Sequence, residues 1–335
     1  MKELSISMKT VLSELENFDE TIPSLTIAKY LVKKYPEIYH NVDYARTTIR
    51  AARGNAGKER RKEFQDKRFY RENRTPERTL AEFNFKPIDL SIADFEFPDK
   101  KPLIMSDIHI PYHSINEVQI AIDYGMKHDV DSIYLNGDIL DCGKISKWAT
   151  DPRMIHFDEE RDMFFAFVEY LKTLNLPIYF KIGNHEERIE HYQMRNAPEL
   201  ARLKDMSISK ILHLEELEIT PINDKQICNM GKLIVIHGHE FGESTYNPVS
   251  PARGVFNKAK YSVLSGHNHQ TTTHHENNLR NDSMACFSVG ALCNLRPPYR
   301  TFAFTKWNYG FAIVEIEDSG DFEVHNKRII NGKVR

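Results

Sequence analysis

The stretch Leu103-Ile104-Met105-Ser106-Asp107-Ile108-His109 contains the pattern that decides the fold of this chain. A short apolar run, with the length and composition of a buried strand, leads into a carboxylate and an imidazole two residues apart. The pattern recurs at Ser132-Ile133-Tyr134-Leu135-Asn136-Gly137-Asp138 and at Ile178-Tyr179-Phe180-Lys181-Ile182-Gly183-Asn184-His185-Glu186. We therefore predict three strands, each of which carries polar side chains at its carboxyl end.

Two further apolar runs have the same form. Residues 233–236 precede His237-Gly238-His239, and residues 261–264 precede Gly266-His267-Asn268-His269. Residues 158–174 place apolar side chains on one helical face, and strands that alternate with helices indicate an α/β domain. The later runs 285–289 and 311–316 have no long helix between them, which predicts a second sheet packed on the first.

Polar side chains therefore follow five predicted strands. Ligand sites in layered α/β domains form at the carboxyl ends of strands, so these five loops are expected to meet at one edge. Any single loop has a simpler interpretation as a turn, a surface histidine or a side chain bonded to nearby backbone. All five in this order indicate one site built from imidazole, carboxylate and amide groups.

The ordered set Asp107-x-His109, Gly137-Asp138, Gly183-Asn184-His185-Glu186, His237 and Gly266-His267-x-His269 resembles the calcineurin-like metallophosphoesterase superfamily. The resemblance spans residues 102–316 and is specific for the superfamily, but it says almost nothing about substrate. It implies an α/β fold with a two-sheet β-sandwich flanked by helices, and two bound divalent metal ions. It also implies ligand roles: Asp107, His109 and His269 for the first ion, Asn184, His237 and His267 for the second, and Asp138 as a bridge between both.

The residue types suit this chemistry. Imidazole with carboxylate favours Mn²⁺ first, and Fe, Zn²⁺ or Ni²⁺ as alternatives, over Ca²⁺. Two ions about 3.5–4 Å apart clamp a phosphoryl group and lower the pKa of a shared water, so that a bridging hydroxide attacks phosphorus in line. His185, which resembles the non-ligand histidine of the family, is our candidate general acid for the leaving oxygen. Glu186 or Asp141 could orient it, and the sequence does not choose between them.

Two more residues near these motifs are candidates. His239 is expected beside the ligand His237, as a neighbour of the ligands. Arg188 either contacts substrate phosphate or is an exposed helical residue paired with Glu187 or Glu190. His274 and His275 are expected on an exposed strand or loop outside the site.

Cys142 limits the choice of substrate. Serine/threonine protein phosphatases of the superfamily carry an arginine at this place after the Gly-Asp motif, and they lack the Gly-His-x-His ending seen here. Protein phosphatase activity is therefore disfavoured. The ending is more similar to the bacterial and phage phosphodiesterase and nuclease-like branch.

The region before residue 98 differs from the rest of the chain in its helical pattern and its charge. Residues 1–55 are expected to form a helical, helix-turn-helix-like region, residues 56–97 a basic charged connector, and residues 98–335 the catalytic domain. Between Arg53 and Arg78 the chain has ten basic and five acidic residues, although its total formal charge is -3. Such a stretch is either a solvated linker laced with ion pairs or a contact for nucleic-acid phosphates.

The same two interpretations apply to particular side chains of this region. Arg46, Arg50 and Arg53 would form one basic stripe on a helix that runs from about residue 42 to 53. Phe64, Phe69 and Tyr70 would stack on bases or dock the connector on the catalytic domain.

Composition excludes several classes. The chain is 41% hydrophobic and 28% charged, as is usual for a soluble globular protein, and no stretch approaches the roughly 18 apolar residues of a membrane span. The amino terminus has no hydrophobic signal core, and the four cysteines are scattered. We expect a cytoplasmic protein with reduced thiols and no membrane partner.

The sequence therefore predicts a metal-dependent phosphodiesterase that acts on nucleic acid or a nucleotide. A phosphomonoesterase for a small phosphorylated metabolite is one alternative. The other is a nucleic-acid-binding module with a vestigial metal domain, against which the intact ligand set argues.

Overall fold

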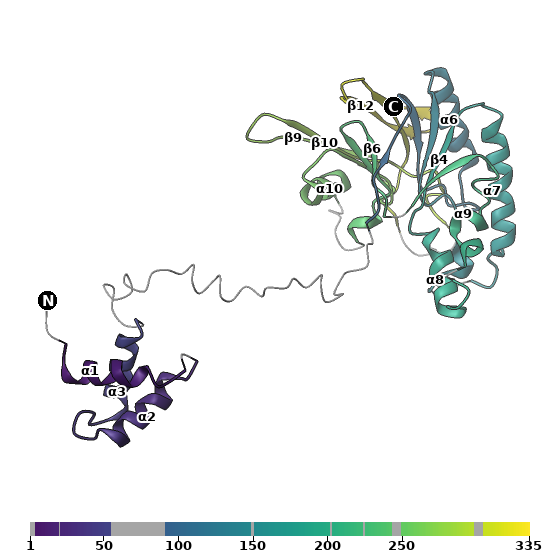
Figure 1. The fold of residues 1–335 in the computed structure, drawn as a ribbon. Coiled ribbons are helices and arrows are strands. Elements are labelled where there is room, and N and C mark those ends of the chain that lie inside the picture. Colours follow the sequence, from purple (N-terminus) through teal and green to yellow (C-terminus); the bar gives the residue numbers. More distant parts are fainter. Residues whose placement is uncertain are drawn as a thin grey trace. The chain divides into compact units, whose positions relative to one another are not determined.

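A computed structural model of the chain describes residues 4–19, 21–54, 91–148, 151–201, 203–223, 225–242, 249–297 and 304–335 (Figure 1). The chain divides into two compact units, 1–89 and 90–335. Most of the predicted basic connector, including Phe64, Phe69 and Tyr70, lies outside the described residues. Among the helices in the described ranges, none combines the length and the apolar character needed to cross a membrane.

The amino-terminal unit contains three helices, α1 (Ile6–Leu15), α2 (Ser24–Lys34) and α3 (Val42–Ala52). The side chains of Ser5 and Asn41 begin α1 and α3 by accepting hydrogen bonds from free backbone amides of the first turn. Apolar residues three or four apart on each helix, such as Ile27 and Leu31, enclose a small core of their own. The helix that we predicted from about residue 42 to 53 is confirmed as α3.

The larger unit has a seven-stranded sheet in the order β13-β12-β11-β2-β3-β4-β5. Its strands are β2 (Pro102–Met105), β3 (Ser132–Asn136), β4 (Ile178–Lys181), β5 (Ile219–Ile222), β11 (Tyr309–Ile316), β12 (Phe322–Ile330) and β13 (Lys333–Val334). Strands β2 to β5 are parallel, so their carboxyl ends share one edge, and β11 joins them antiparallel to β2.

The second sheet has six strands in the order β1-β6-β7-β8-β10-β9. They are β1 (Phe95–Glu96), β6 (Cys228–Met230), β7 (Leu233–Ile236), β8 (Val263–Ser265), β9 (Thr272–Asn277) and β10 (Ser283–Ser288). Strands β7 and β8 are parallel neighbours, as β2 and β3 are in the first sheet.

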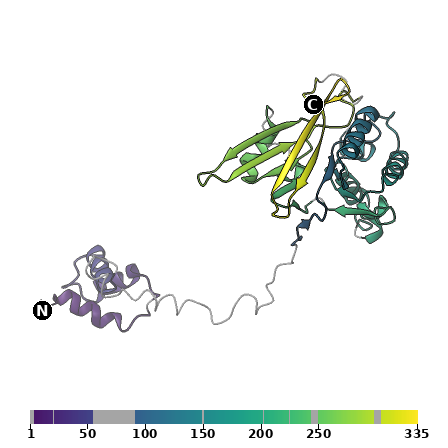
Figure 2. The same ribbon diagram turned by 90° about the horizontal axis from the view of Figure 1, so that it is seen from above.

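Helices cover the outer faces of the two sheets. They are α6 (Ile115–Lys127), α7 (Phe157–Lys172), α8 (Glu187–Asn196), α9 (Ile208–Ile211) and α10 (Pro251–Ala259), with 3₁₀ turns at Gly143–Ile145, Lys204–Met206 and His239–Phe241. In Figure 2 the blue and teal helices lie on the side of their sheet away from the green six-stranded sheet. The expected two-sheet α/β sandwich flanked by helices is therefore confirmed.

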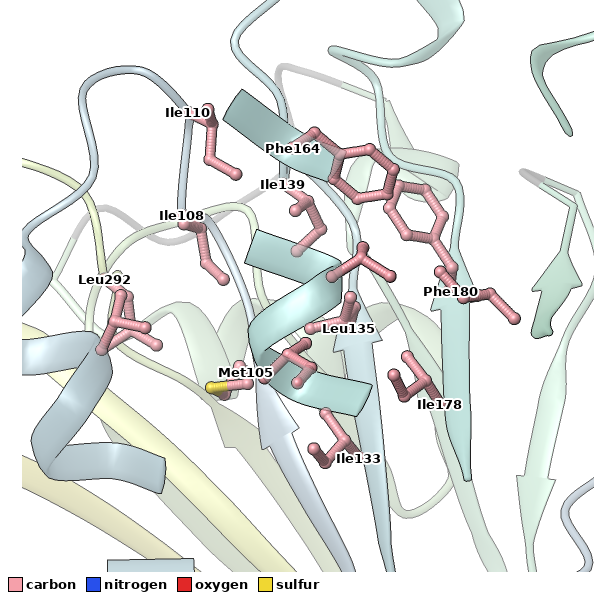
Figure 3. Packing of buried hydrophobic residues seen from close by; sticks show 14 of the residues in the cluster. Met105, Ile108, Ile110, Ile133, Leu135, Ile139, Phe164, Ile178, Phe180 and Leu292 are labelled. Atoms are coloured by element: carbon pink, nitrogen blue, oxygen red, sulfur yellow. The ribbon is translucent and has the colours of Figure 1, made fainter. Parts of the chain in front are cut away.

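Alternation along the buried strands creates the two layers of the core. In β2, Leu103 and Met105 face the helices while Ile104 faces the other sheet. Phe164 of α7 packs against Phe180 of β4 on the helical side (Figure 3). Because both faces of these strands are covered, their residues are mostly apolar, as we inferred from the sequence.

Candidate metal centre

Loops that leave five strands bring the predicted site residues together. Asp107 and His109 follow β2, Asp138 follows β3, and Asn184 follows β4 in one sheet. His237 follows β7 in the other sheet, and the segment after β8 supplies His267 and His269. Because the strands in each group are parallel neighbours, all of these loops leave the same edge of the sandwich.

One group of donor atoms lies around Asp107. Its Oδ1 is 3.0 Å from Nε2 of His269, which in turn is 3.2 Å from Nε2 of His109. The same His109 nitrogen is 3.9 Å from Oδ2 of Asp138. Asp107, His109 and Asp138 have donor atoms that all lie within 4.8 Å of one another.

A second group lies on the other side of Asp138. Nε2 of His237 is 3.3 Å from Oδ2 of Asp138 and 3.2 Å from Oδ1 of Asn184. Asp138, His237 and His267 also have donor atoms within 4.8 Å of one another. The carboxylate of Asp138 therefore belongs to both groups.

The backbone is strained at five of these positions. Asp107, His109, Asp138, His267 and His269 all have positive φ angles, between 50° and 65°. Residues with a side chain rarely adopt this left-handed conformation, and where they do the strain is commonly found at functional sites. In the loop after β2 it lets both polar side chains turn toward the donor groups while Ile108 between them points into the core (Figure 3).

A close approach between two loops explains why a glycine, Gly137, precedes Asp138. The φ of Gly137 is 79°, and a Cβ atom there would lie 2.5 Å from Nδ1 of His237. That distance is too short for any real side chain, so only glycine lets the two loops approach.

A match to a protein-family model completes this description. The model of the calcineurin-like phosphoesterase family matches residues 100–293, which is more than half of the chain. The chain belongs to the calcineurin-like phosphoesterase family.

Several solved structures are similar to this member of the family. Vacuolar protein sorting 29 from Cryptosporidium parvum has 14% identity, covers 70% of this chain and 94% of its own, and has a TM-score of 0.37. The phosphoesterase Yfce from E. coli has 14% identity, with 66% of this chain and 96% of that protein covered and a TM-score of 0.32. Nuclease MPE from Pseudomonas putida has 15% identity, with 67% of this chain and 86% of that protein covered and a TM-score of 0.29. No curated protein matched the chain.

The buried carboxylate of Glu186 holds the loops of this phosphoesterase in place. It accepts hydrogen bonds from the backbone amides of Asp138, Ile139, Leu140 and Gly183, at 2.8–3.0 Å. Burial and the charge of Asp138 raise the pKa of Glu186, while the backbone donors oppose that shift. Glu186 was one of the two candidates to orient His185, but its hydrogen bonds position the backbone of these loops.

Asp141 is the acid that contacts His185. Nδ1 of His185 lies 2.7 Å from the Asp141 carbonyl oxygen and 3.5 Å from its carboxylate. The same carboxylate lies 3.2 Å from Nδ1 of His109. Asp141 therefore orients both imidazoles, and Nε2 of His185 is left 3.7 Å from Asp138.

Arg188 and His239 both lie at the rim of the centre. Arg188 donates to the Asp141 carbonyl and lies 2.8 Å from Nε2 of His185, so it is not merely a helical surface residue. The His239 ring is 5.4 Å from that of His237 between centroids, and its Nε2 lies 2.9 Å from Glu187. By contrast, His274 and His275 lie on the edge strand β9, as expected.

Other residues at the centre were not predicted from the sequence. The Asn136 carbonyl lies 2.7 Å from Nδ1 of His237, and the Ser106 hydroxyl donates to Asp107. Sγ of Cys293 lies 4.0 Å from Nδ1 of His269, and the Trp307 ring packs on the same imidazole. Ser106 and Asn136 adjoin the motifs, so position along the chain was the available signal.

The imidazoles and carboxylates of the cluster shift one another's pKa. Burial alone would lower the pKa of His237 and His269, but the carboxylates of Asp138 and Asp107 raise both to about 10. Burial in turn acts to raise the pKa of these carboxyls, and the imidazoles hold both below their usual range. Two charged carboxylates are therefore concentrated in a volume that water scarcely reaches.

The donor set fits divalent metal ions. Oδ1 of Asp107 is buried, and its one close polar contact among the described residues is the ion pair with Nε2 of His269. The Nδ1 atoms of His109 and His237 face fixed oxygens, so their Nε2 lone pairs can point inward. Imidazole, carboxylate and amide oxygen together match borderline transition ions better than Ca²⁺.

Proposed function

We propose that this chain is a two-metal phosphodiesterase that acts on nucleic acid or a nucleotide. The observation that carries the proposal is the pair of donor groups that share Asp138. A shared carboxylate between two ligand sets is the arrangement that two-metal phosphoester hydrolysis needs.

Each donor group would hold one ion. Asp107, His109 and His269 would bind the first, and Asn184, His237 and His267 the second, with Asp138 between them. When bound, such ions lower the pKa of water and neutralise the charge of the phosphoryl group. The protein contributes fixed donors, because Glu186 and Asp141 hold the loops and rings that carry them.

His185 would act as the general acid. Its Nδ1 proton is directed to the Asp141 carbonyl, which fixes the ring with Nε2 toward the centre. To donate a proton to the leaving oxygen, Nε2 must be protonated and must part from Arg188, which can only donate. We infer that Arg188 turns to the anionic phosphate when substrate binds and so releases His185.

Cys142 favours a phosphodiester over a phosphoprotein. The side chain is 1% exposed, and its backbone amide donates to Glu160. It offers no cation to a phosphate at the position where the protein phosphatases of the family carry arginine.

The amino-terminal unit and the basic stretch after it favour a polyanionic substrate. Arg46 and Arg50 are exposed on α3. Arg53 departs from the predicted stripe, because its guanidinium donates to the Ile22 carbonyl and the Ser24 hydroxyl. The excess of basic residues in 53–78 remains the main support, since lysine and arginine neutralise phosphates without reading sequence.

The test uses the full chain loaded with Mn²⁺. We expect hydrolysis of bis-p-nitrophenyl phosphate and of DNA or RNA to exceed that of p-nitrophenyl phosphate, and to disappear when metal is removed. A preference for the monoester would instead support the metabolite phosphatase. Absence of both bound metal and hydrolysis would leave only a binding module.

A further inference from the structure

Lys181 is a charged residue that is completely buried. It ends β4 with 0% of its side chain exposed. Alternation along β4 places Phe180 against the helices and Lys181, like Tyr179, on the side of the second sheet. Since an unpaired buried ammonium is very costly, its partners identify what it does.

These partners join the two sheets. Nζ of Lys181 donates to the carbonyls of Asn223 and Gln226, at 2.7 and 2.8 Å, in the turn that leads from β5 to β6. The same ammonium lies 3.3 Å from Oε1 of Glu240. Glu240 belongs to the 3₁₀ turn after β7, so this ion pair connects β4 of the first sheet to a loop of the second.

Glu240 in turn holds the loop that carries His237. Its carboxylate oxygens accept hydrogen bonds from the backbone amides of His237 at 3.1 Å and Gly238 at 2.6 Å. Gly238 has a φ of 130°, a conformation open to glycine. The carboxylate therefore fixes the turn by which His237 reaches the centre.

Both ends of the ion pair lie close to ligands of the second ion. Lys181 precedes Asn184 by three residues, and Glu240 follows His237 by three. Oδ1 of Asn184 and Nε2 of His237 approach to 3.2 Å. The ion pair thus links the two loops that supply these donors.

We propose that the Lys181–Glu240 ion pair positions Asn184 and His237, and so sets the affinity of the second metal site. This inference rests on the two-metal site proposed above. Lys181 and Glu240 are positioning residues, because they act through the loops and not on the substrate. Loss of the ammonium leaves the carboxylate without its nearest fixed cation, so Glu240 turns to solvent and releases both amides.

The experiment measures metal binding by the full chain without any substrate. Co²⁺ is titrated by calorimetry and by its visible absorption into the wild type, Lys181→Met and Glu240→Gln. We expect one of the two Co²⁺ affinities to fall by about 10- to 100-fold in both variants, as is usual when an orienting partner is lost. Tyr179→Phe, in the same strand, removes only a hydrogen bond to Asp99 and is expected to keep both affinities.

Double variants identify which site is affected. Added to Asn184→Ala, which removes a proposed second-site ligand, Lys181→Met should cause little further loss of affinity. Added to Asp107→Asn, which damages the first site, it should keep its full effect. Residues that act on one site are non-additive, and residues that act on different sites are additive.

Three results would overturn the inference. One is a folded Lys181→Met or Glu240→Gln protein that binds two ions as tightly as the wild type and has only a lower melting temperature. Another is an equal loss of both ions in either variant. If the wild type itself bound fewer than two ions, the proposed function would fail first, and the inference with it.

Discussion

Two buried carboxylates, Glu186 and Asp141, hold the loops and rings of this centre in position. Glu186 gathers four backbone amides from two loops, and Asp141 contacts two imidazoles. Hydrogen bonds to a charged acceptor are stronger than neutral ones, and the bond from its amide to Glu186 offsets the cost of the left-handed backbone at Asp138. The candidate donor side chains are therefore held in place by their surroundings.

Asp138→Asn should lower metal content as well as turnover. The amide keeps the acceptor for the His185 backbone but removes the charge that both ions would share. We expect metal affinity to fall by more than the roughly 10- to 100-fold that loss of an orienting partner costs. Elemental analysis and kcat for bis-p-nitrophenyl phosphate test this, with the exposed Asp123→Asn as control. Two ions retained at wild-type affinity would contradict the bridging role.

His185→Asn should separate chemistry from metal binding. A general acid contributes roughly 10²- to 10⁴-fold to a rate, and the contribution is largest for leaving groups that need a proton. We therefore expect unchanged metal content and a larger loss of kcat for phenyl than for p-nitrophenyl diesters. His274→Asn, a histidine on β9 outside the centre, serves as the control. Loss of metal in His185→Asn would show that its assigned role is wrong.

At the scale of elements, the sequence predicted what is apolar and regular. Strands β2, β3, β4, β7, β10 and β11 and helix α7 were predicted close to their observed bounds. Strand β8 begins at Val263, two residues later than predicted. Strands β1, β5, β6, β9, β12 and β13 were not predicted. Strands β1, β6 and β13 have only two or three residues, and β9, Thr272–Asn277, is a polar edge strand.

The candidate site likewise has residues that the sequence predicted and residues that it did not. The apolar runs predicted that the loops carrying these side chains would meet, and the resemblance to the family implied seven of them as ligands. The structure brings these side chains together. Lys181 was not predicted, because the carbonyls of Asn223 and Gln226 and the Glu240 carboxylate are far from it along the chain. Glu240 was not predicted either, although the two amides that it binds are only two and three residues away. The role of Glu186 was missed because four amides from two separate loops leave no pattern in the sequence.

Glu14 makes the stability of the helical unit depend on pH. Hydrogen bonds from Tyr35 and Lys34 lower the pKa of this carboxyl below its usual value of 4.5. A lowered folded pKa means that the contribution is complete above about pH 4.5 and is lost as pH falls through the folded value. Hydrogen exchange of residues 4–54, corrected for intrinsic rates, should therefore show weakening protection on acidification.

Glu14→Gln should remove this dependence. The variant is expected to be less protected at neutral pH and to change little through the same window. Glu16→Gln, at an exposed neighbouring position, should behave like the wild type. An equally steep acid loss in Glu14→Gln would show that another group controls the stability of this unit.

At the scale of the whole molecule, the two compact units suggest a division of labour. Each has its own apolar core, and the donor groups all come from residues after 100. A chain that begins at residue 90 should hydrolyse bis-p-nitrophenyl phosphate with unchanged kcat/KM. Its affinity for DNA or RNA should fall roughly tenfold or more at low salt, because basic residues that neutralise phosphates are removed. Equal nucleic-acid affinity in the long and short chains would place the binding surface in the catalytic unit.

The central claim is that two metal ions share Asp138. The most direct measurement is anomalous X-ray scattering from crystals of the full chain grown with Mn²⁺. We predict two peaks, one among Asp107, His109 and His269 and one among Asn184, His237 and His267, about 3.5–4 Å apart with Asp138 between them. A single peak, or no peak in protein that still hydrolyses phosphodiesters, would contradict the account.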